Sequence, residues 1–271
     1  MSPLWRDEVG IFVGPRRVVL TRMGRGLRPA CIAEQALQVE GGSFSDWEPS
    51  LAVLAASLSD ARWQDGNARI VVANHWMRYA LVPWSGDLQE DSERHAHAWL
   101  VLHEVYGDAV NGWKVALGET VPGRPQLACA MPAELHLALL SVVAAARLRP
   151  VSLQPHLVVS FDRWRDRVPA GGGWLVVIDD GTLAAARLDG EGWAEVHCVR
   201  IGDDWSAELK RLQTFGRLAG GHPDGGRVLV EAPYWLRRIA SERDDSLEWL
   251  ESGDGPAGTL EKLARLTEMN V

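Results

Sequence analysis

Residues 171–189, Gly-Gly-Gly-Trp-Leu-Val-Val-Ile-Asp-Asp-Gly-Thr-Leu-Ala-Ala-Ala-Arg-Leu-Asp, carry the pattern from which the fold is predicted. The three glycines indicate a linker or tight turn. Residues 174–178 and 182–188 are apolar and β-rich, and the Asp-Gly pair between them is a strong hairpin signal. A second turn at 189–192 and a third strand over 193–201 complete a predicted three-stranded meander.

The segment after this meander is predicted to add a helix and a strand. Asp203 or Asp204 is suited to cap a helix over 205–218, and residues 227–231 form an apolar strand pattern. The order of elements from the glycine run onward is therefore β-β-β-α-β. Two further helices are predicted, at 234–241 and 259–267.

The N-terminal part shows the same order of elements without evident sequence identity to the second copy. Apolar runs separated by glycine-containing turns predict three strands. Asp46 is suited to cap a helix whose larger apolar residues recur at helical spacing, and an apolar strand follows. The duplication is thus one of element order. The predicted strands cover 9–13, 18–23, 30–39 and 68–73, and the helix covers 47–58.

The region between the two copies is predicted to hold additional elements. We expect a first half over 1–170, with an insertion near 75–125, and a second half over 171–271. Pro132 suits the first turn of an amphipathic helix. Within this region the predicted strands are 77–84, 113–117, 127–131 and 151–153, and the predicted helices are 87–106, 132–147 and 156–165.

Composition narrows the functional classes. The 271 residues include 46% apolar and 24% charged residues, an ordinary globular balance that supports a core without disulfides or metals. The formal net charge of −8 argues against a general nucleic-acid binder. Cys31, Cys129 and Cys198 are far apart and form no Cys-x-x-Cys motif, so buried thiols in a reducing cytosol are expected. No secretory signal or membrane-spanning apolar run is predicted.

Three stretches resemble the PilM-like actin-fold proteins of type IV pilus biogenesis, which are related to the cytoplasmic part of the type II secretion L protein. Residues 74–84, Asn-His-Trp-Met-Arg-Tyr-Ala-Leu-Val-Pro-Trp, are followed by an acidic stretch, a helix and Tyr-Gly. Residues 131–135 lead through an Ala-rich helix into residues 148–155. The resemblance implies an α/β, actin-like (duplicated ribonuclease-H-like) fold, with two β-β-β-α-β halves and inserted elements.

The resemblance also raises the question of nucleotide binding, since the actin-like fold holds ATP between two hairpin turns. The first turn here, with Gly14 and Arg16, lacks the family's Asp-x-Gly, and Pro15 removes a backbone donor. The side chain of Arg16 is suited either to bind a phosphate or to remain in solvent. The second turn, Asp180-Gly181-Thr182, resembles the family's second phosphate loop and is equally consistent with a plain β-turn. We expect no required cofactor and leave ATP with Mg²⁺ open.

Aromatic residues and arginine are common anchors of protein interfaces. Four such residues on and around one predicted strand are the candidates for partner binding, with core packing between the halves as the alternative. They are Trp76, Arg78, Tyr79 and Trp84.

Two functional hypotheses remain. The resemblance implies a non-catalytic cytoplasmic scaffold that docks the cytoplasmic tail of an inner-membrane pilus or secretion component. Such a protein would lie in the cytoplasm, at the inner-membrane face, and would reach the membrane only through its partner. The alternative is an actin-like ATPase or phosphotransferase, motivated by the Asp180 turn. A homodimer is left open. A nuclease is disfavoured because strand 9–13 carries no carboxylate, and no pattern of metal ligands is evident.

Overall fold

A computed structural model describes most of the chain. The described residues are 7–24, 30–41, 45–189, 192–202, 205–218, 227–232 and 247–250. The helices predicted at 234–241 and 259–267, and the capping residues Asp203 and Asp204, lie outside them.

The first half is built on a five-stranded sheet in the order β3-β2-β1-β4-β8. The hairpin partners β1 and β2 are antiparallel, as are β2 and β3, whereas β4 runs parallel to both β1 and β8. Helix α1, Glu48–Leu58, connects β3 to β4. The strands are β1 (Glu8–Val13), β2 (Arg17–Met23), β3 (Cys31–Gln38), β4 (Gly66–Val72) and β8 (Leu148–Pro155).

The second half repeats this topology in the order β11-β10-β9-β12-β13. Its central strand β9 is buried along its whole length, as its continuous apolar run requires. The repeated order confirms the predicted duplicated actin-like fold. The short strand β13 was not predicted. The elements are β9 (Gly173–Asp179), β10 (Thr182–Asp189), β11 (Gly192–Arg200), α5 (Trp205–Leu218), β12 (Arg227–Glu231) and β13 (Leu247–Trp249).

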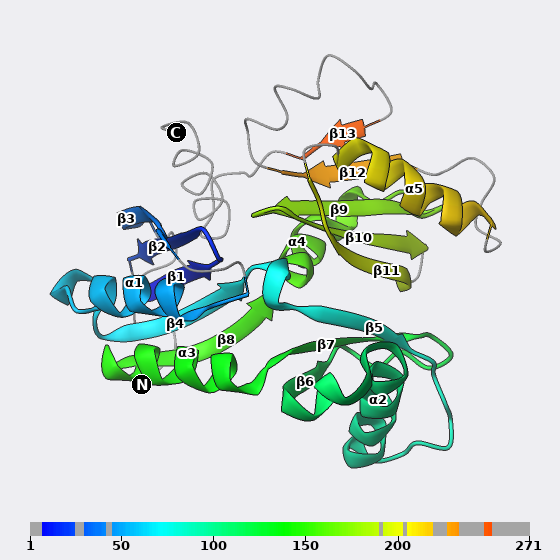
Figure 1. Cartoon of the computed structure of the whole chain (residues 1–271), viewed down its shortest axis with the longest axis horizontal. Helices are drawn as coiled ribbons and strands as arrows, with labels where there is room; N and C mark the ends of the chain where they lie inside the picture. The colour runs from blue at the N-terminus through cyan, green and yellow to red at the C-terminus, as the bar shows by residue number, and fades with distance from the viewer. Residues whose placement is uncertain are drawn as a thin grey trace.

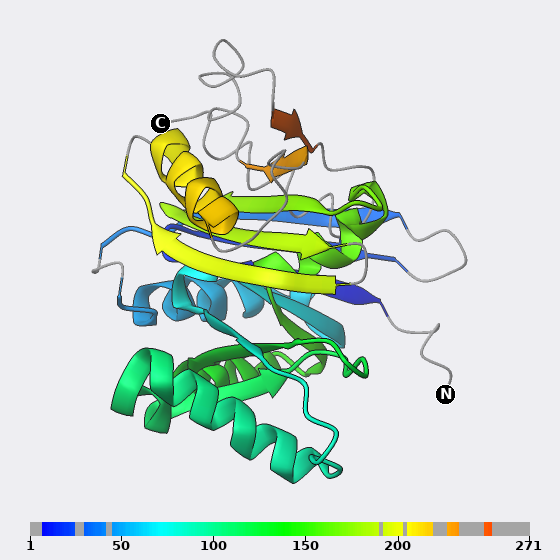
Figure 2. The ribbon, with the colours of Figure 1, turned by 90° about the vertical axis from the view of Figure 1, so that its right-hand side faces the viewer.

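A third, smaller sheet lies between β4 and α3 in the sequence, and its strand β5 contacts β11 of the second half (Figures 1 and 2). Its order is β5-β7-β6, and helix α2 packs on it through Ala98 and Leu102. Helix α2 begins later than predicted because the side chains and backbones of Glu90 and Glu93 form a reciprocal capping box there. The elements are β5 (Arg78–Val82), α2 (Asp91–Tyr106), β6 (Trp113–Leu117) and β7 (Gln126–Pro132).

Successive side chains of the first sheet point to opposite faces, and both faces are buried. One face of β1 contributes Ile11 to the main core, together with apolar residues of α1 and α3 (Ala133–Ala145). The other face contributes Phe12 to a small cluster that includes Val159 of α4 (His156–Trp164). Helix α4 follows β8 and lies between the two large sheets (Figure 1). It therefore places its N-terminal residue where the two halves meet.

Truncation of Leu139 tests which face of α3 enters the core. Leu139 is fully buried, whereas Leu137, two residues earlier, is 65% exposed. We expect Leu139→Ala to lower the free energy of unfolding by about 2–5 kcal/mol, because it leaves a cavity. The matched control Leu137→Ala should change it by no more than about 0.5 kcal/mol. Urea denaturation followed by tryptophan fluorescence measures both values, and equal losses would contradict the assigned face.

Candidate functional site

The two hairpin turns predicted to face a nucleotide lie against each other. In the second turn, Asp180 and Gly181 both have positive φ, of 39° and 74°, as a tight two-residue hairpin turn requires. In the first turn, Gly14 is so close to the second half that an added Cβ would lie 2.4 Å from Oδ2 of Asp180. The sequence candidates Gly14, Asp180, Gly181 and Thr182 are thus brought together.

The cation that meets Asp180 is Arg17, one residue beyond the predicted Arg16. Arg17 Nε lies 3.7 Å from Oδ1 of Asp180, and both side chains are buried. Arg16 has an exposed side chain, and its backbone N–H donates to the Asp180 carboxylate. Burial raises the pKa of Asp180, an effect that Arg17 opposes and Asp179 reinforces.

Asp179, at the end of β9, is the most enclosed acidic group of this contact. Its side chain is fully buried, and its Oδ2 accepts hydrogen bonds from the backbone N–H and the side-chain amide of Asn74, each at 3.3 Å. The same oxygen lies 2.7 Å from Nδ1 of His156. Asn74 follows β4 and His156 follows β8, so two separate segments of the first half hold one carboxylate of the second.

His156 lies between two carboxylates. Its Nε2 lies 3.5 Å from Oε1 of Glu231, while Oε2 of Glu231 accepts a 2.5 Å hydrogen bond from the indole N–H of Trp164. Burial alone would lower the pKa of His156, but the hydrogen bonds to Asp179 and Glu231 raise it to about 9. Burial would likewise raise the pKa of Glu231, but its hydrogen bond to His156 and the charges of His156 and Arg163 hold it below its usual value. The imidazole is therefore a cation at neutral pH.

We call this contact between the two halves the seam. In the seam, residues near the strand ends of the two halves are joined by hydrogen bonds, by ion pairs and by one close backbone approach. Its members are Gly14, Arg17, Asn74, His75 and His156 of the first half, and Asp179, Asp180, Thr182 and Glu231 of the second.

A cleft lies beside the seam. The turn Asn74–Trp76, labelled η3, separates the two. His75 contacts Thr182 across the seam, with 3.2 Å between Nδ1 and Oγ1, and also lines the cleft. The cleft has a volume of about 110 Å³. We call it the tryptophan cleft, and its lining is Ser45, Trp47, His75, Trp76, Arg78, Trp113, Pro132 and Arg200.

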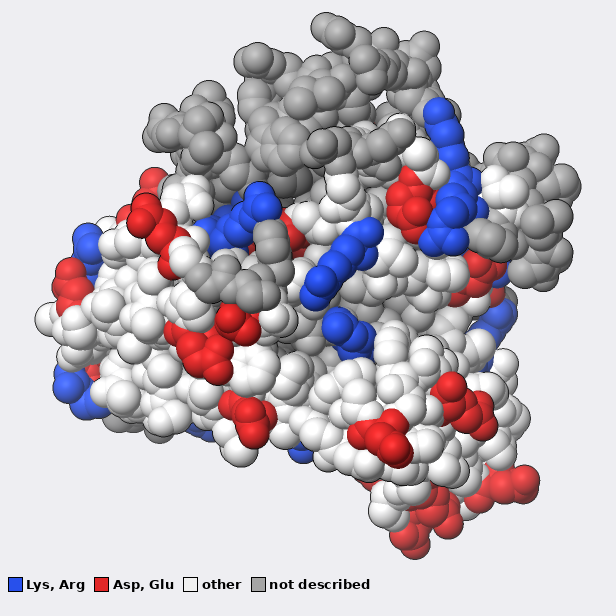
Figure 3. Space-filling view, viewed as in Figure 1, with Lys and Arg blue, Asp and Glu red and all other residues white. Residues whose placement is uncertain are grey.

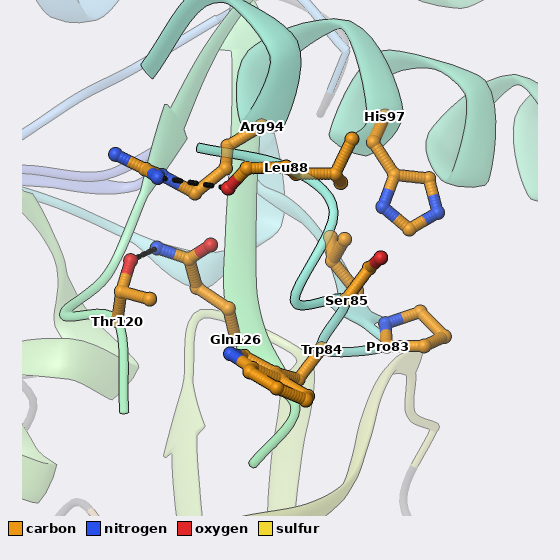
Figure 4. Close-up of a pocket in the computed structure, with 9 residues that line it drawn as sticks. Pro83, Trp84, Ser85, Leu88, Arg94, His97, Thr120 and Gln126 are labelled. Atoms are coloured by element: carbon orange, nitrogen blue, oxygen red, sulfur yellow. Dashed lines mark hydrogen bonds between the residues drawn. The ribbon is translucent and has the colours of Figure 1, made fainter. Parts of the chain in front are cut away.

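The four residues predicted to bind a partner are divided among three places. Trp76 and Arg78 line the tryptophan cleft. Tyr79 is buried, and its hydroxyl donates a 2.7 Å hydrogen bond to Oδ1 of Asn74. Trp84 is 46% exposed and borders a separate hollow of about 30 Å³ beside α2 (Figure 4). That hollow has room for about one water molecule, so it is no docking site by itself.

Sequence reasoning missed Arg17, Asn74, His156 and Glu231. Arg17 begins a strand and the other three follow or end one, and only the association of the two halves brings them together. His156 directly after Pro155 gave the start of a helix, but nothing local indicated its two carboxylate partners. The sequence placed Trp47 at the start of a helix and Trp113 at the start of a strand, and nothing local indicated that they share a cleft.

The two sheets and the apposed hairpin turns define a protein of the actin-like fold. No protein-family model matches the chain, and no curated protein matches it. Among the described residues, no helix combines the length and apolar character needed to cross a membrane.

Solved structures share this fold over most of the chain. A PilM–PilN type IV pilus biogenesis complex is 18% identical, covers 90% of this chain and 88% of its own, and gives a TM-score of 0.66. The cytoplasmic domain of EpsL, an inner-membrane component of the type II secretion system of Vibrio cholerae, is 10% identical, with coverage of 96% and 95% and a TM-score of 0.58. A Bacteroides thetaiotaomicron protein, described as having an actin-like ATPase fold and unknown function, is 6% identical, with 96% coverage of both chains and a TM-score of 0.60.

The charge of His156 makes the stability of the chain dependent on pH. A pKa raised from 6.5 to about 9 corresponds to about 3 kcal/mol, at about 1.36 kcal/mol per unit. This stabilisation is complete below pH 6.5 and is lost as the pH rises through about 9, because only the folded chain holds the proton between these values. Urea denaturation at several pH values should show this loss in the wild type and in His95→Gln, which alters an exposed histidine. The loss of stability with rising pH should be absent from His156→Gln. If this variant showed the same pH dependence as the wild type, the assignment of the charge to His156 would be contradicted.

Proposed function

We propose that this chain is a non-catalytic cytoplasmic scaffold of a type IV pilus or type II secretion-like assembly. In this proposal it lies at the inner-membrane face and docks the cytoplasmic tail of an inner-membrane component. The shared fold supports the proposal, since one solved relative in fold is a complex of PilM with PilN and another is the cytoplasmic domain of an inner-membrane secretion component.

The observation that carries the non-catalytic part is the contact between the two hairpin turns. An actin-like ATPase needs room for phosphates between these turns. Here Gly14 lies against the carboxylate of Asp180, and Arg17 supplies the positive charge beside it. His156 similarly provides the cation between Asp179 and Glu231. The side chains of the protein thus stand where a nucleotide and its metal ion would have to enter, which supports a scaffold that functions without either.

One observation favours the alternative of an ATPase or phosphotransferase. Oδ1 of Asp179 and Oδ2 of Asp180 are buried and accept no hydrogen bond from the described residues. Carboxylate oxygens of this kind are suitable Mg²⁺ ligands. Binding ATP with Mg²⁺ would require the two turns to separate, which breaks the contact of Asp180 with Arg17.

The tryptophan cleft is the part of the surface best suited to hold a tail. It is open beside the closed seam, and two of the residue types that anchor interfaces, Trp and Arg, line it. Its volume of about 110 Å³ is below the ~300–1,000 Å³ of small-molecule sites, so it suits a few side chains of a peptide.

Site-specific crosslinking in the native host tests the docking function. A photoreactive amino acid at position 45, exposed at the cleft, should crosslink to the cytoplasmic tail of an inner-membrane protein. The same amino acid at position 32, an exposed site on the edge strand β3, serves as the control. Mass spectrometry identifies the adducts. A cleft that gives no membrane-protein adduct, or gives the same adduct as the control site, would overturn the docking proposal.

Calorimetric titration with ATP and Mg²⁺ tests the absence of a nucleotide requirement. We expect no binding at millimolar ATP, because the seam already occupies the space between the turns. Tight binding that Asp180→Ala abolishes, while Asp189→Ala at a half-buried ion pair leaves it intact, would support the ATPase alternative instead.

A further inference from the structure

Two arginines of the tryptophan cleft have no acidic partner among the residues that the structure describes. Arg78 donates hydrogen bonds to the backbone carbonyls of His75 and Met77, at 3.3 and 2.7 Å, which hold its guanidinium beside η3. Arg200 ends β11 and is exposed. No carboxylate of the described chain forms an ion pair with either residue, whereas many other described arginines, including Arg17 and Arg187, are paired.

The charge around the cleft contrasts with that of the chain. The sequence carries a formal net charge of −8, and acidic side chains cover the α2 region at the lower right of Figure 3. Basic side chains lie in the middle of the same face, where the second half meets the smaller sheet (Figure 3). An acidic segment would be repelled by most of this surface and attracted to a place where cations are unpaired.

We infer that the tryptophan cleft recognises an acidic residue of a peptide, next to an apolar residue. The inference rests on the proposed docking function and specifies the chemistry of the tail. Its carboxylate lies between the guanidinium groups of Arg78 and Arg200. The neighbouring apolar side chain packs on Trp47 and Trp113. Arginine suits this role because its planar donors pair with carboxylate oxygens in a defined geometry.

Selection from a displayed library of random peptides tests the inference on the full chain. Selected sequences should be enriched in Asp or Glu beside an apolar residue. A selected peptide should bind Arg78→Gln and Arg200→Gln about tenfold or more weakly, since each loses a charge-assisted hydrogen bond. The matched control Arg149→Gln, which removes an exposed arginine of β8 outside the cleft, should leave the affinity unchanged.

Charge reversal keeps the test independent of any effect on folding. Arg200 is exposed, so Arg200→Glu should fold normally. It should weaken binding of the acidic peptide more than Arg200→Gln does and should improve binding of the same peptide with Lys in place of the acid. Fluorescence polarisation with labelled peptides measures these affinities.

The outcomes separate this inference from the proposed function. Selected apolar peptides that lack an acid, and whose binding Arg78→Gln and Arg200→Gln leave unchanged, would overturn the inference while supporting docking. Peptides that bind without contacting the cleft, or the absence of any selected peptide together with a failed crosslinking experiment, would overturn both. Loss of binding to phosphatidylglycerol vesicles in the arginine variants, without acid enrichment among peptides, would assign these cations to lipid and overturn the inference.

Discussion

Burial of the Asp179 carboxylate is the constraint on which the arrangement of the two halves depends. A carboxylate without solvent must be paired or hydrogen-bonded, because desolvation of an isolated charge is very unfavourable. Its partners, Asn74 and His156, both belong to the first half, so the charge is satisfied only when the halves are together. The other ring nitrogen of His156, Nε2, lies 3.5 Å from Oε1 of Glu231. Association of the halves and neutralisation of the buried charges are therefore the same event.

The sheet topology explains why these residues meet. In each half the central strands run parallel, β1 with β4 and β8, and β9 with β12. The carboxyl ends of parallel strands lie at one edge of a sheet, which is where open α/β sheets gather their functional residues. Gly14, Asn74 and His156 follow such ends in the first half, and Asp179 and Glu231 terminate them in the second. The seam is the junction of these two edges.

The fold was predictable from the sequence to a greater extent than the site, for a physical reason. Strand and helix patterns are local, so the apolar run before Asp179 and the Asp180-Gly181 turn predicted a second meander. The partners of a buried charge are separated by tens of residues in the chain, and no local pattern encodes them. The difference between Arg16 and Arg17 is an example, because a shift of one residue at the start of a strand points a side chain to the other face. The capping box that delays α2 is a different case, because its two glutamates are only three residues apart and form a local pattern.

The turn η3 connects the seam to the tryptophan cleft. Asn74 holds Asp179 on one side, His75 contacts Thr182, and Trp76 lines the cleft on the other. Arg78 is in turn fixed by its hydrogen bonds to the backbone of this same segment. The position of the cleft residues therefore depends on the closed seam, and any ligand that prefers this arrangement of the cleft stabilises the seam by the same free energy. His156 and Arg17 pair with carboxylates of the second half, so the closed seam keeps the cleft residues in place. In the proposed docking function, a preformed cleft lowers the ordering cost of binding a flexible tail.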